Sequence, residues 1–464
     1  MKISAKPLFL IVSASFGFFG ARYVAHADDT DFRKKKVVII GGGMAGIGVA
    51  AMLKQEGMKN VTIIEPSPSI YYQPLWTLVG AGLKKNVETV KPVADVVPSG
   101  TSLLPLSVSA IDPVNNTLFL SDKSVVSYDY LVVAAGIQMN WDKVSGLTDA
   151  LKDKSSGVVS IYGYDLSAAA WEAFDAFKKG RLIFNMPSTP IKCAGAPQKI
   201  MWLVEEMLRD RNIRETASVE FWVPGGAMFG VKKYSDQLEI IRQQRNVDAQ
   251  FKQELVSVDG NAKTAVFKSL ENGSTSTQAF DILHVVPPMS APDFLKASPL
   301  ADAQGWVDVN KFTLQSKKYP NVFGLGDCTN TPNSKTGAAV TAQAPVVVHN
   351  LIQHSKDSDA KLTGQYNGYA SCPLVIGKNK VILAEFGYDG KIMETFDATN
   401  GKFPYRLLSY TGPLKDYTLY WMKSTMFPFV FWHLWPRACW YGSCGPFKPN
   451  VVPAVDLEAP KVSK

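Results

Sequence analysis

Cysteine and histidine are both scarce in this sequence, which contains five of each in 464 residues. The number of cysteines is odd, no two of them form a CxxC pair, and the histidines are dispersed. A sparse, odd set in a long chain excludes a disulfide scaffold. The lack of clustered Cys and His ligands also gives a zinc site no support, so we expect no bound metal.

An excess of one charge is also missing. The net charge of +8 is modest, the lysines are scattered, and no long basic run is interleaved with aromatic residues. We therefore expect no nucleic-acid partner, whereas an anionic membrane surface or a small anionic substrate fits this charge. The length predicts two or three domains, with enough interior to enclose a large cofactor.

Acidic residues are absent from positions 1–27, which also contain an apolar stretch at 7–20. This composition is typical of a targeting segment, and the stretch is short for a membrane span. The run followed by Ala25-His26-Ala27 fits a bacterial export signal. The lack of acids, with Arg22 near the end, fits a mitochondrial presequence equally well, so composition leaves both open.

The other end of the chain is aromatic. Residues 417–440 read YTLYWMKSTMFPFVFWHLWPRACW and hold four of the ten tryptophans. Lys423, Pro428, His433 and Arg437 interrupt the apolar run, which makes it a weak transmembrane span. Tryptophan and tyrosine favour the headgroup zone, so we expect a tail that lies in the membrane interface. The alternative is a tail packed on the protein's own core or in a dimer contact.

A glycine-rich turn follows the first buried strand pattern. Residues 36–40 read as a strand, and Gly41, Gly43 and Gly46 then form a GxGxxG motif before a helical pattern. In this motif Gly41 permits a tight turn, Gly43 lets the backbone approach a pyrophosphate, and Gly46 allows close packing of helix and strand. Glu65, at the end of a second strand at 61–65, can accept hydrogen bonds from ribose. These features predict a dinucleotide site.

Two later segments identify FAD as the dinucleotide. Residues 322–327 resemble the late strand-plus-GD motif of flavoproteins with two dinucleotide domains, in which the aspartate, here Asp327, holds the ribityl chain. The strand pattern at 128–134, which ends at Gly136, resembles the middle motif of the same superfamily. A C-x4-C pair near the flavin helix is absent, which argues against the glutathione-reductase type.

The second domain has a degenerate nicotinamide-nucleotide motif. In the turn at 224–230, Ala227 replaces the central glycine, and Pro224 and Phe229 would crowd the backbone. The following strand near 247–252 ends without the expected acid. NAD(P)H is therefore not expected, and another reductant must supply the electrons.

Two cysteines have the surroundings of reactive thiols. Cys193 precedes a helical pattern at 197–209 and lies near Lys192 and Lys199, which predicts a lowered pKa and a good nucleophile. Cys372 is followed by a proline and lies far from Cys193 in the sequence, so any pairing of the two is tertiary. Taken singly, each could be a small buried apolar residue. We assign Cys328 to that class, and packing or interface roles to Cys439 and Cys444.

Several longer segments resemble the mitochondrial type of sulfide:quinone oxidoreductase. They extend from about residue 37 to 410 and read GGGMAGI, IYYQPLWTLVGAG, TPIKCAGAPQKIM, FGVKKY, VVPPMSAPD, YPNVFGLGDCTNTPNSKT and SCPLVIGKNKVILAEF. The resemblance implies that Cys193 and Cys372 are the redox pair and that sulfide leaves a persulfide on Cys372. Two electrons then pass through FAD to ubiquinone, and glutathione or sulfite removes the sulfane sulfur.

The resemblance also implies flavin contacts and a location. The expected FAD-binding residues are Gly41, Gly43, Met44, Ala45, Gly46, Glu65, Gln73, Val108, Gly136, Asp327, Lys335 and Gly337. No cysteine precedes Cys193, so we expect the FAD to be held without a covalent bond. The expected location is the mitochondrial inner membrane, as a peripheral or monotopic enzyme. An exported, membrane-associated bacterial enzyme is the alternative.

We therefore predict an α/β fold with two Rossmann-like dinucleotide-binding domains and a C-terminal membrane-associating segment. The expected parts are a targeting segment (1–34), an FAD-binding domain (35–154 and 300–355), a second Rossmann-like domain (155–299), a region with the second redox cysteine (356–410) and the aromatic, amphipathic tail (411–464).

Two other functions compete with this prediction. A type II NADH:quinone oxidoreductase has the same architecture, but it would need an intact second GxGxxG motif. A flavin-holding redox sensor that has lost turnover would not need the paired cysteines.

Overall fold

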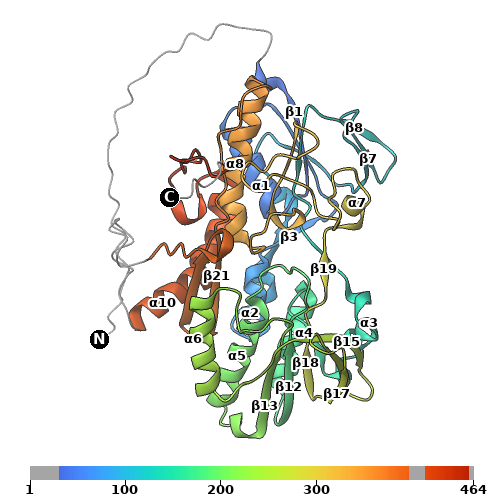
Figure 1. Ribbon diagram of the computed structural model, residues 1–464, viewed down its shortest axis with the longest axis vertical. Helices are drawn as coiled ribbons and strands as arrows, with labels where there is room; N and C mark the ends of the chain where they lie inside the picture. Colours follow the sequence, from blue (N-terminus) through green and yellow to red (C-terminus); the bar gives the residue numbers. More distant parts are fainter. Residues whose placement is uncertain (1–30, 397–412, 459–464) are drawn as a thin grey trace, which may run out of the picture. The chain divides into compact units, whose positions relative to one another are not determined.

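The computed structural model describes residues 31–396 and 413–458 (Figure 1). The expected targeting segment therefore lies almost entirely outside the described residues, as do parts of the tail. The described chain contains two parallel sheets of five strands each, together with smaller antiparallel sheets.

The first parallel sheet carries the predicted dinucleotide turn. Its strand order is β20, β9, β1, β2 and β5, which span Val322–Gly324, Tyr130–Val133, Lys36–Ile40, Asn60–Ile64 and Ser102–Leu104. Val37 and Ile39 face helices α1 (Met44–Gln55) and α8 (Gly337–Lys356), and Val38 and Ile40 face a second apolar cluster. Both faces are covered, which explains the continuous apolar strands. The strands predicted at 36–40, 61–65 and 128–134 are confirmed, with ends that differ by up to two residues.

The second parallel sheet has the order β11, β18, β12, β13 and β14. These strands span Val158–Val159, Ile282–His284, Gly180–Asn185, Ala217–Trp222 and Asp248–Gln250. Helix α5 (Ala196–Asp210) covers one face, and the antiparallel strands β15 (Gln253–Asp259) and β16 (Thr264–Ser269) contribute to the core on the other. Two Rossmann-like sheets are thus present, and the predicted α/β class is confirmed.

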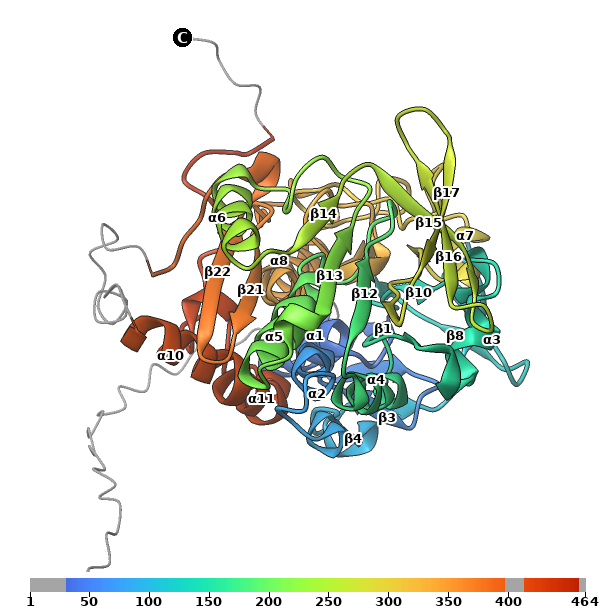
Figure 2. The same cartoon turned by 90° about the horizontal axis from the view of Figure 1, so that it is seen from below.

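A two-stranded hairpin places Cys372 next to helices α5 and α8. Strands β21 (Ala370–Gly377) and β22 (Lys380–Phe386) pair antiparallel, and β21 contacts both α5 and α8 (Figure 2). Helix α10 (Pro413–Trp421) then packs on β22. Cys372 on β21 is in this way placed beside the helix that follows Cys193.

The aromatic tail buries one face and exposes another. Its buried side chains join the core around α1 and include Leu419, Met422, Phe431, Trp432 and Trp435. Tyr417, Trp421 and Phe429 remain 55%, 46% and 54% exposed. Packing on the protein's own core, the alternative considered above, therefore applies to one face of the tail. In the described ranges, no helix is both long enough and apolar enough to cross a bilayer.

Candidate functional site

The glycine-rich turn has the geometry of a pyrophosphate cradle. Gly41 has a φ of +106°, and a Cβ on Gly46 would lie 1.9 Å from the carbonyl oxygen of Gly41. A Cβ on Gly43 would meet nothing within 4 Å, so the backbone is open at this position. Helix α1 has no side-chain cap. The N–H groups of its first turn, which includes Met44 and Ala45, are therefore available to an anion.

Glu65 is fixed beside this turn. It follows β2 directly, and its carboxylate accepts hydrogen bonds from the backbone N–H groups of Gly42 and Ser67, both at 2.7 Å. These two bonds hold one acidic group on the strand next to the glycine turn. This is the position from which a carboxylate can bind ribose hydroxyls in a Rossmann unit.

Two further expected contacts lie at the ends of neighbouring strands. Gly136 follows β9, has a φ of +70° and has open space where a Cβ would be. Asp327 follows β20, and no hydrogen bond from the described residues engages its carboxylate. Burial raises the pKa of Asp327, and the positive charges of Lys335 and Lys192 oppose this shift. A partly buried carboxylate to which no described residue donates a hydrogen bond is suited to bind ligand hydroxyls.

Gln73 and Lys335 connect the flavin region with the cysteine loop. The Gln73 side chain accepts a hydrogen bond of 2.7 Å from Lys192, the residue before Cys193. The backbone carbonyl of Lys335 accepts a bond of 2.7 Å from the N–H of Cys193. The ammonium group of Lys335 donates to the carbonyl oxygen of Thr329 at 2.9 Å.

The remaining two expected contacts also lie near the turn. Val108 is buried in the cluster that contains Ile40 and Ile64, the last residues of β1 and β2. Gly337 begins helix α8, and a Cβ there would lie 2.9 Å from the sulfur of Met44. The structure therefore gathers all the expected flavin contacts around the carboxyl edge of the first sheet.

Cys193 and Cys372 lie side by side. Their Sγ atoms are 3.6 Å apart, although one residue precedes α5 and the other lies on β21. Cys193 has a φ of +55°, and its backbone bond to Lys335 holds this conformation. A Cβ on Gly195 would come within 2.5 Å of the Cys372 sulfur, so only glycine permits this approach.

The two thiols differ in acidity. The hydrogen bond from Cys372 and the charge of Lys199, whose Nζ lies 3.3 Å from the Cys193 sulfur, lower the pKa of Cys193 well below its usual range. The same hydrogen bond and burial raise the pKa of Cys372. Cys193 is therefore the more acidic thiol of the pair. The shift has the direction expected from the sequence, but Cys372 contributes most to it.

Lys423 is a site residue that the sequence did not reveal. It lies in the π-helical turn Met422–Met426 of the tail, is 2% exposed and donates a hydrogen bond to the carbonyl of Pro74. Burial, with repulsion from Lys199, lowers the pKa of Lys423 to about 7, and the negative charge of the thiols opposes this shift. The only feature of the sequence that could have pointed to this residue is the presence of a lysine inside an aromatic run.

Lys252 lies beside the degenerate turn of the second domain. The N–H of Lys252 bonds to the carbonyl of Gly225 at 3.1 Å, and the end of its side chain lies 3.4–3.6 Å from a Cβ placed on Gly226. Helix α6 (Lys232–Gln244) follows the turn. That this turn does not bind a nicotinamide nucleotide stays a prediction, and it rests on Pro224, Ala227 and Phe229 in the sequence.

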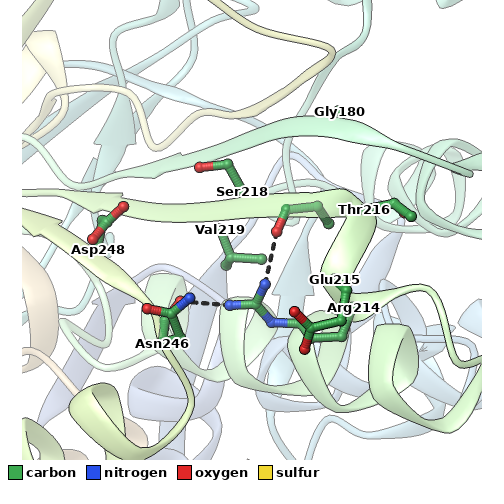
Figure 3. A pocket seen from close by; sticks show the side chains of 9 residues that line it. Gly180, Arg214, Glu215, Thr216, Ser218, Val219, Asn246 and Asp248 are labelled. Atoms are coloured by element: carbon green, nitrogen blue, oxygen red, sulfur yellow. Dashed lines mark hydrogen bonds between the residues drawn. The ribbon is translucent and has the colours of Figure 1, made fainter.

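A hollow of about 450 Å³ opens at the amino ends of β12, β13 and β14 (Figure 3). Arg214 lines it and donates to the backbone carbonyls of Ala217, Arg245 and Asn246. Its guanidinium is therefore already engaged. Cys193 and the glycine turn of the first sheet follow the carboxyl ends of strands, where ligands bind in open α/β sheets, so the hollow is not part of this site.

The other three cysteines stand apart from the pair. Cys328 is fully buried, and its thiol donates to the carbonyls of Val133 and Leu325, which fits the packing role expected from the sequence. Cys439 is exposed and Cys444 is partly exposed. In the part of the chain that the structure describes, no group of three or more His, Cys, Asp or Glu could hold a metal ion.

The two sheets and the glycine turn define a dinucleotide-dependent oxidoreductase. The family model described as pyridine nucleotide-disulphide oxidoreductase matches residues 14–161. The mitochondrial sulfide:quinone oxidoreductase of Mus musculus is 42% identical over 88% of this chain and 87% of its own. That of Schizosaccharomyces pombe is also 42% identical, over 89% and 93%. The chain therefore belongs to the sulfide:quinone oxidoreductase family.

A solved structure supports the fold. The sulfide:quinone oxidoreductase of Aquifex aeolicus superposes with a TM-score of 0.68 at 19% identity, and the match covers 86% of this chain and 91% of that one. The chain is a flavin-dependent oxidoreductase with FAD as its cofactor. The open backbone at Gly43, the uncapped start of α1 and the carboxylate of Asp327, to which no described residue donates a hydrogen bond, fit this group.

Proposed function

We propose that this chain oxidises sulfide with a quinone as electron acceptor, and that Cys193 and Cys372 carry the chemistry. The observation that supports this most strongly is the contact of the two sulfurs at 3.6 Å, with Lys199 beside Cys193. Thiol–disulfide exchange needs one sulfur that is attacked and one that leaves as a stabilised thiolate. The pair provides both.

In the oxidised enzyme a sulfur–sulfur bridge joins the two cysteines. Hydrosulfide attacks the sulfur of Cys372, a persulfide forms there, and Cys193 leaves as a thiolate that Lys199 stabilises. A small thiol or sulfite then takes the outer sulfur, which leaves two reduced cysteines. When the bridge forms again, the pair loses two electrons and its protons. FAD, bound without a covalent link, supplies the two-electron chemistry that connects this pair to the quinone.

The donor specificity tests the proposal. Purified, detergent-solubilised protein should reduce decylubiquinone with sulfide in the presence of glutathione or sulfite, and one quinone should be reduced for each sulfide consumed. NADH should be inert, because Pro224, Ala227 and Phe229 depart from the glycine motif that would bind it. Quinone reduction by NADH alone, without sulfide turnover, would assign the chain to the NADH:quinone oxidoreductases instead.

We further propose that the exposed aromatic stripe of the tail binds a membrane surface. Tyr417, Trp421 and Phe429 are exposed at successive positions along the tail, and the net charge is positive. Aromatic side chains of this kind favour the interface, and a quinone reaches the enzyme from the bilayer. The relatives' mitochondrial location supports the mitochondrial inner membrane, with peripheral or monotopic attachment.

Replacing both Trp421 and Phe429 with alanine should weaken binding to vesicles of zwitterionic and anionic phospholipid. Each side chain loses the free energy of burial in the interface, so we expect a fall in partition coefficient of at least about tenfold. Cosedimentation with vesicles measures it. Phe119→Ala removes an exposed aromatic residue outside the tail and is the matched control. Equal binding of all three proteins would contradict the proposed surface.

A further inference from the structure

The buried face of the tail runs along helix α1, whose first turn forms the dinucleotide cradle. Trp435 is 1% exposed, and its indole Nε1 donates a hydrogen bond of 2.8 Å to the carbonyl oxygen of Met44. Met44 is the first residue of α1. A residue of the tail is therefore bonded directly to the turn that presents its N–H groups to the cofactor.

The indole also explains a glycine inside this helix. A Cβ on Gly48 would lie 2.0 Å from Cζ2 of Trp435, so the ring rests against the bare backbone of α1. Glycine in a helix interior costs about 1 kcal/mol relative to alanine. The Trp435 ring occupies the space that a side chain at position 48 would need.

The contact continues to the far end of the helix. We call residues 435–448 the strap. The Tyr441 hydroxyl donates to the Gln55 side chain at 3.0 Å, and Lys448 forms an ion pair with Glu56. Gly442, with a φ of +61°, approaches Thr341 on α8 so closely that a Cβ would lie 2.1 Å from its Oγ1. The strap thus holds α1 at both ends and also contacts α8.

We propose that the strap retains the cofactor and that Trp435 is a positioning residue for FAD. The N–H groups of the first turn bind an anion well only if the backbone is already fixed in the required conformation. The indole fixes that turn through the Met44 carbonyl and through its packing on Gly48. Its effect on the cofactor passes through α1.

The rate of FAD release from the full-length holoenzyme tests this proposal. After dilution, released FAD is measured by its fluorescence in wild type, Trp435→Phe and Trp435→Leu. The Phe variant keeps most of the packing and loses the hydrogen bond, so release should be about three- to tenfold faster, and the Leu variant should lose FAD faster still. Vesicle binding should stay at the wild-type level in the Phe variant. Trp421→Ala changes an exposed residue, so it should bind vesicles more weakly and release FAD at the wild-type rate.

The pair Gly48→Ala and Trp435→Leu separates a specific contact from general damage. Gly48→Ala should speed FAD release because the methyl group displaces the indole. In the double variant the space is restored, so its release rate should match that of Trp435→Leu alone. Additive effects of the two substitutions would overturn the proposal. So would wild-type release rates in both Trp435 variants.

Discussion

Replacing either Cys193 or Cys372 with serine should abolish sulfide-dependent quinone reduction. Neither variant can form the bridge that hydrosulfide attacks. The cysteine that remains has no second sulfur within reach with which to form a disulfide. We therefore expect kcat to fall by at least about 10³-fold, as for catalytic groups that act as a unit. The double variant should be no worse than either single variant. Decylubiquinone reduction with sulfide measures all three.

Alkylation should separate the roles of the two thiols. Because Cys193 has the lowered pKa, iodoacetamide should alkylate it in the reduced wild type at mildly acidic pH, while Cys372 stays unmodified. Cys372→Ala removes the hydrogen-bond donor that contributes most to this shift, so in that variant alkylation of Cys193 should require a higher pH. Cys439→Ser changes an exposed cysteine outside the pair and is the control. If Cys193→Ser or Cys372→Ser reduces quinone with sulfide at more than about a tenth of the wild-type rate, the paired-thiol mechanism is wrong.

Local sequence patterns predicted the part of the site that depends on local geometry. The roles of Gly41, Gly43 and Gly46 follow from one turn, and Glu65 follows from the end of the adjacent strand. The backbone conformations and close approaches at these positions need glycine in any Rossmann unit. The degenerate turn around Ala227 could be recognised for the same reason.

The parts that depend on tertiary packing could not be derived in this way. The distance between Cys193 and Cys372 is set by the approach of a hairpin to α5, and no spacing in the sequence encodes it. The amphipathic pattern of the tail indicated a membrane surface but not which face would be buried. Trp435 is buried against α1, and Lys423 is buried near the two thiols.

Lys423→Met should stabilise the protein and slow the enzyme. Burial of the ammonium group costs free energy, and methionine fills a similar volume without a charge, so we expect a gain of about 1–4 kcal/mol in the free energy of unfolding. Lys423 also contributes a positive charge that lowers the pKa of Cys193. Without it, the thiolate should be less stable as a leaving group and kcat should fall by about tenfold.

The pH dependence of stability gives the sharper test. In the folded protein the pKa of Lys423 is about 7, below that of an exposed lysine, so between pH 7 and pH 10 the unfolded chain binds one more proton than the native one. Stability must therefore rise with pH in this window, by about 2 kcal/mol between pH 7 and pH 9 relative to Lys423→Met. Urea unfolding at the two pH values measures this difference. Lys268→Met, at an exposed position on β16, should follow the wild type. Parallel pH dependences of wild type and Lys423→Met would mean that Lys423 keeps its proton in the folded protein. Lys423 would then be a permanent second cation beside Lys199.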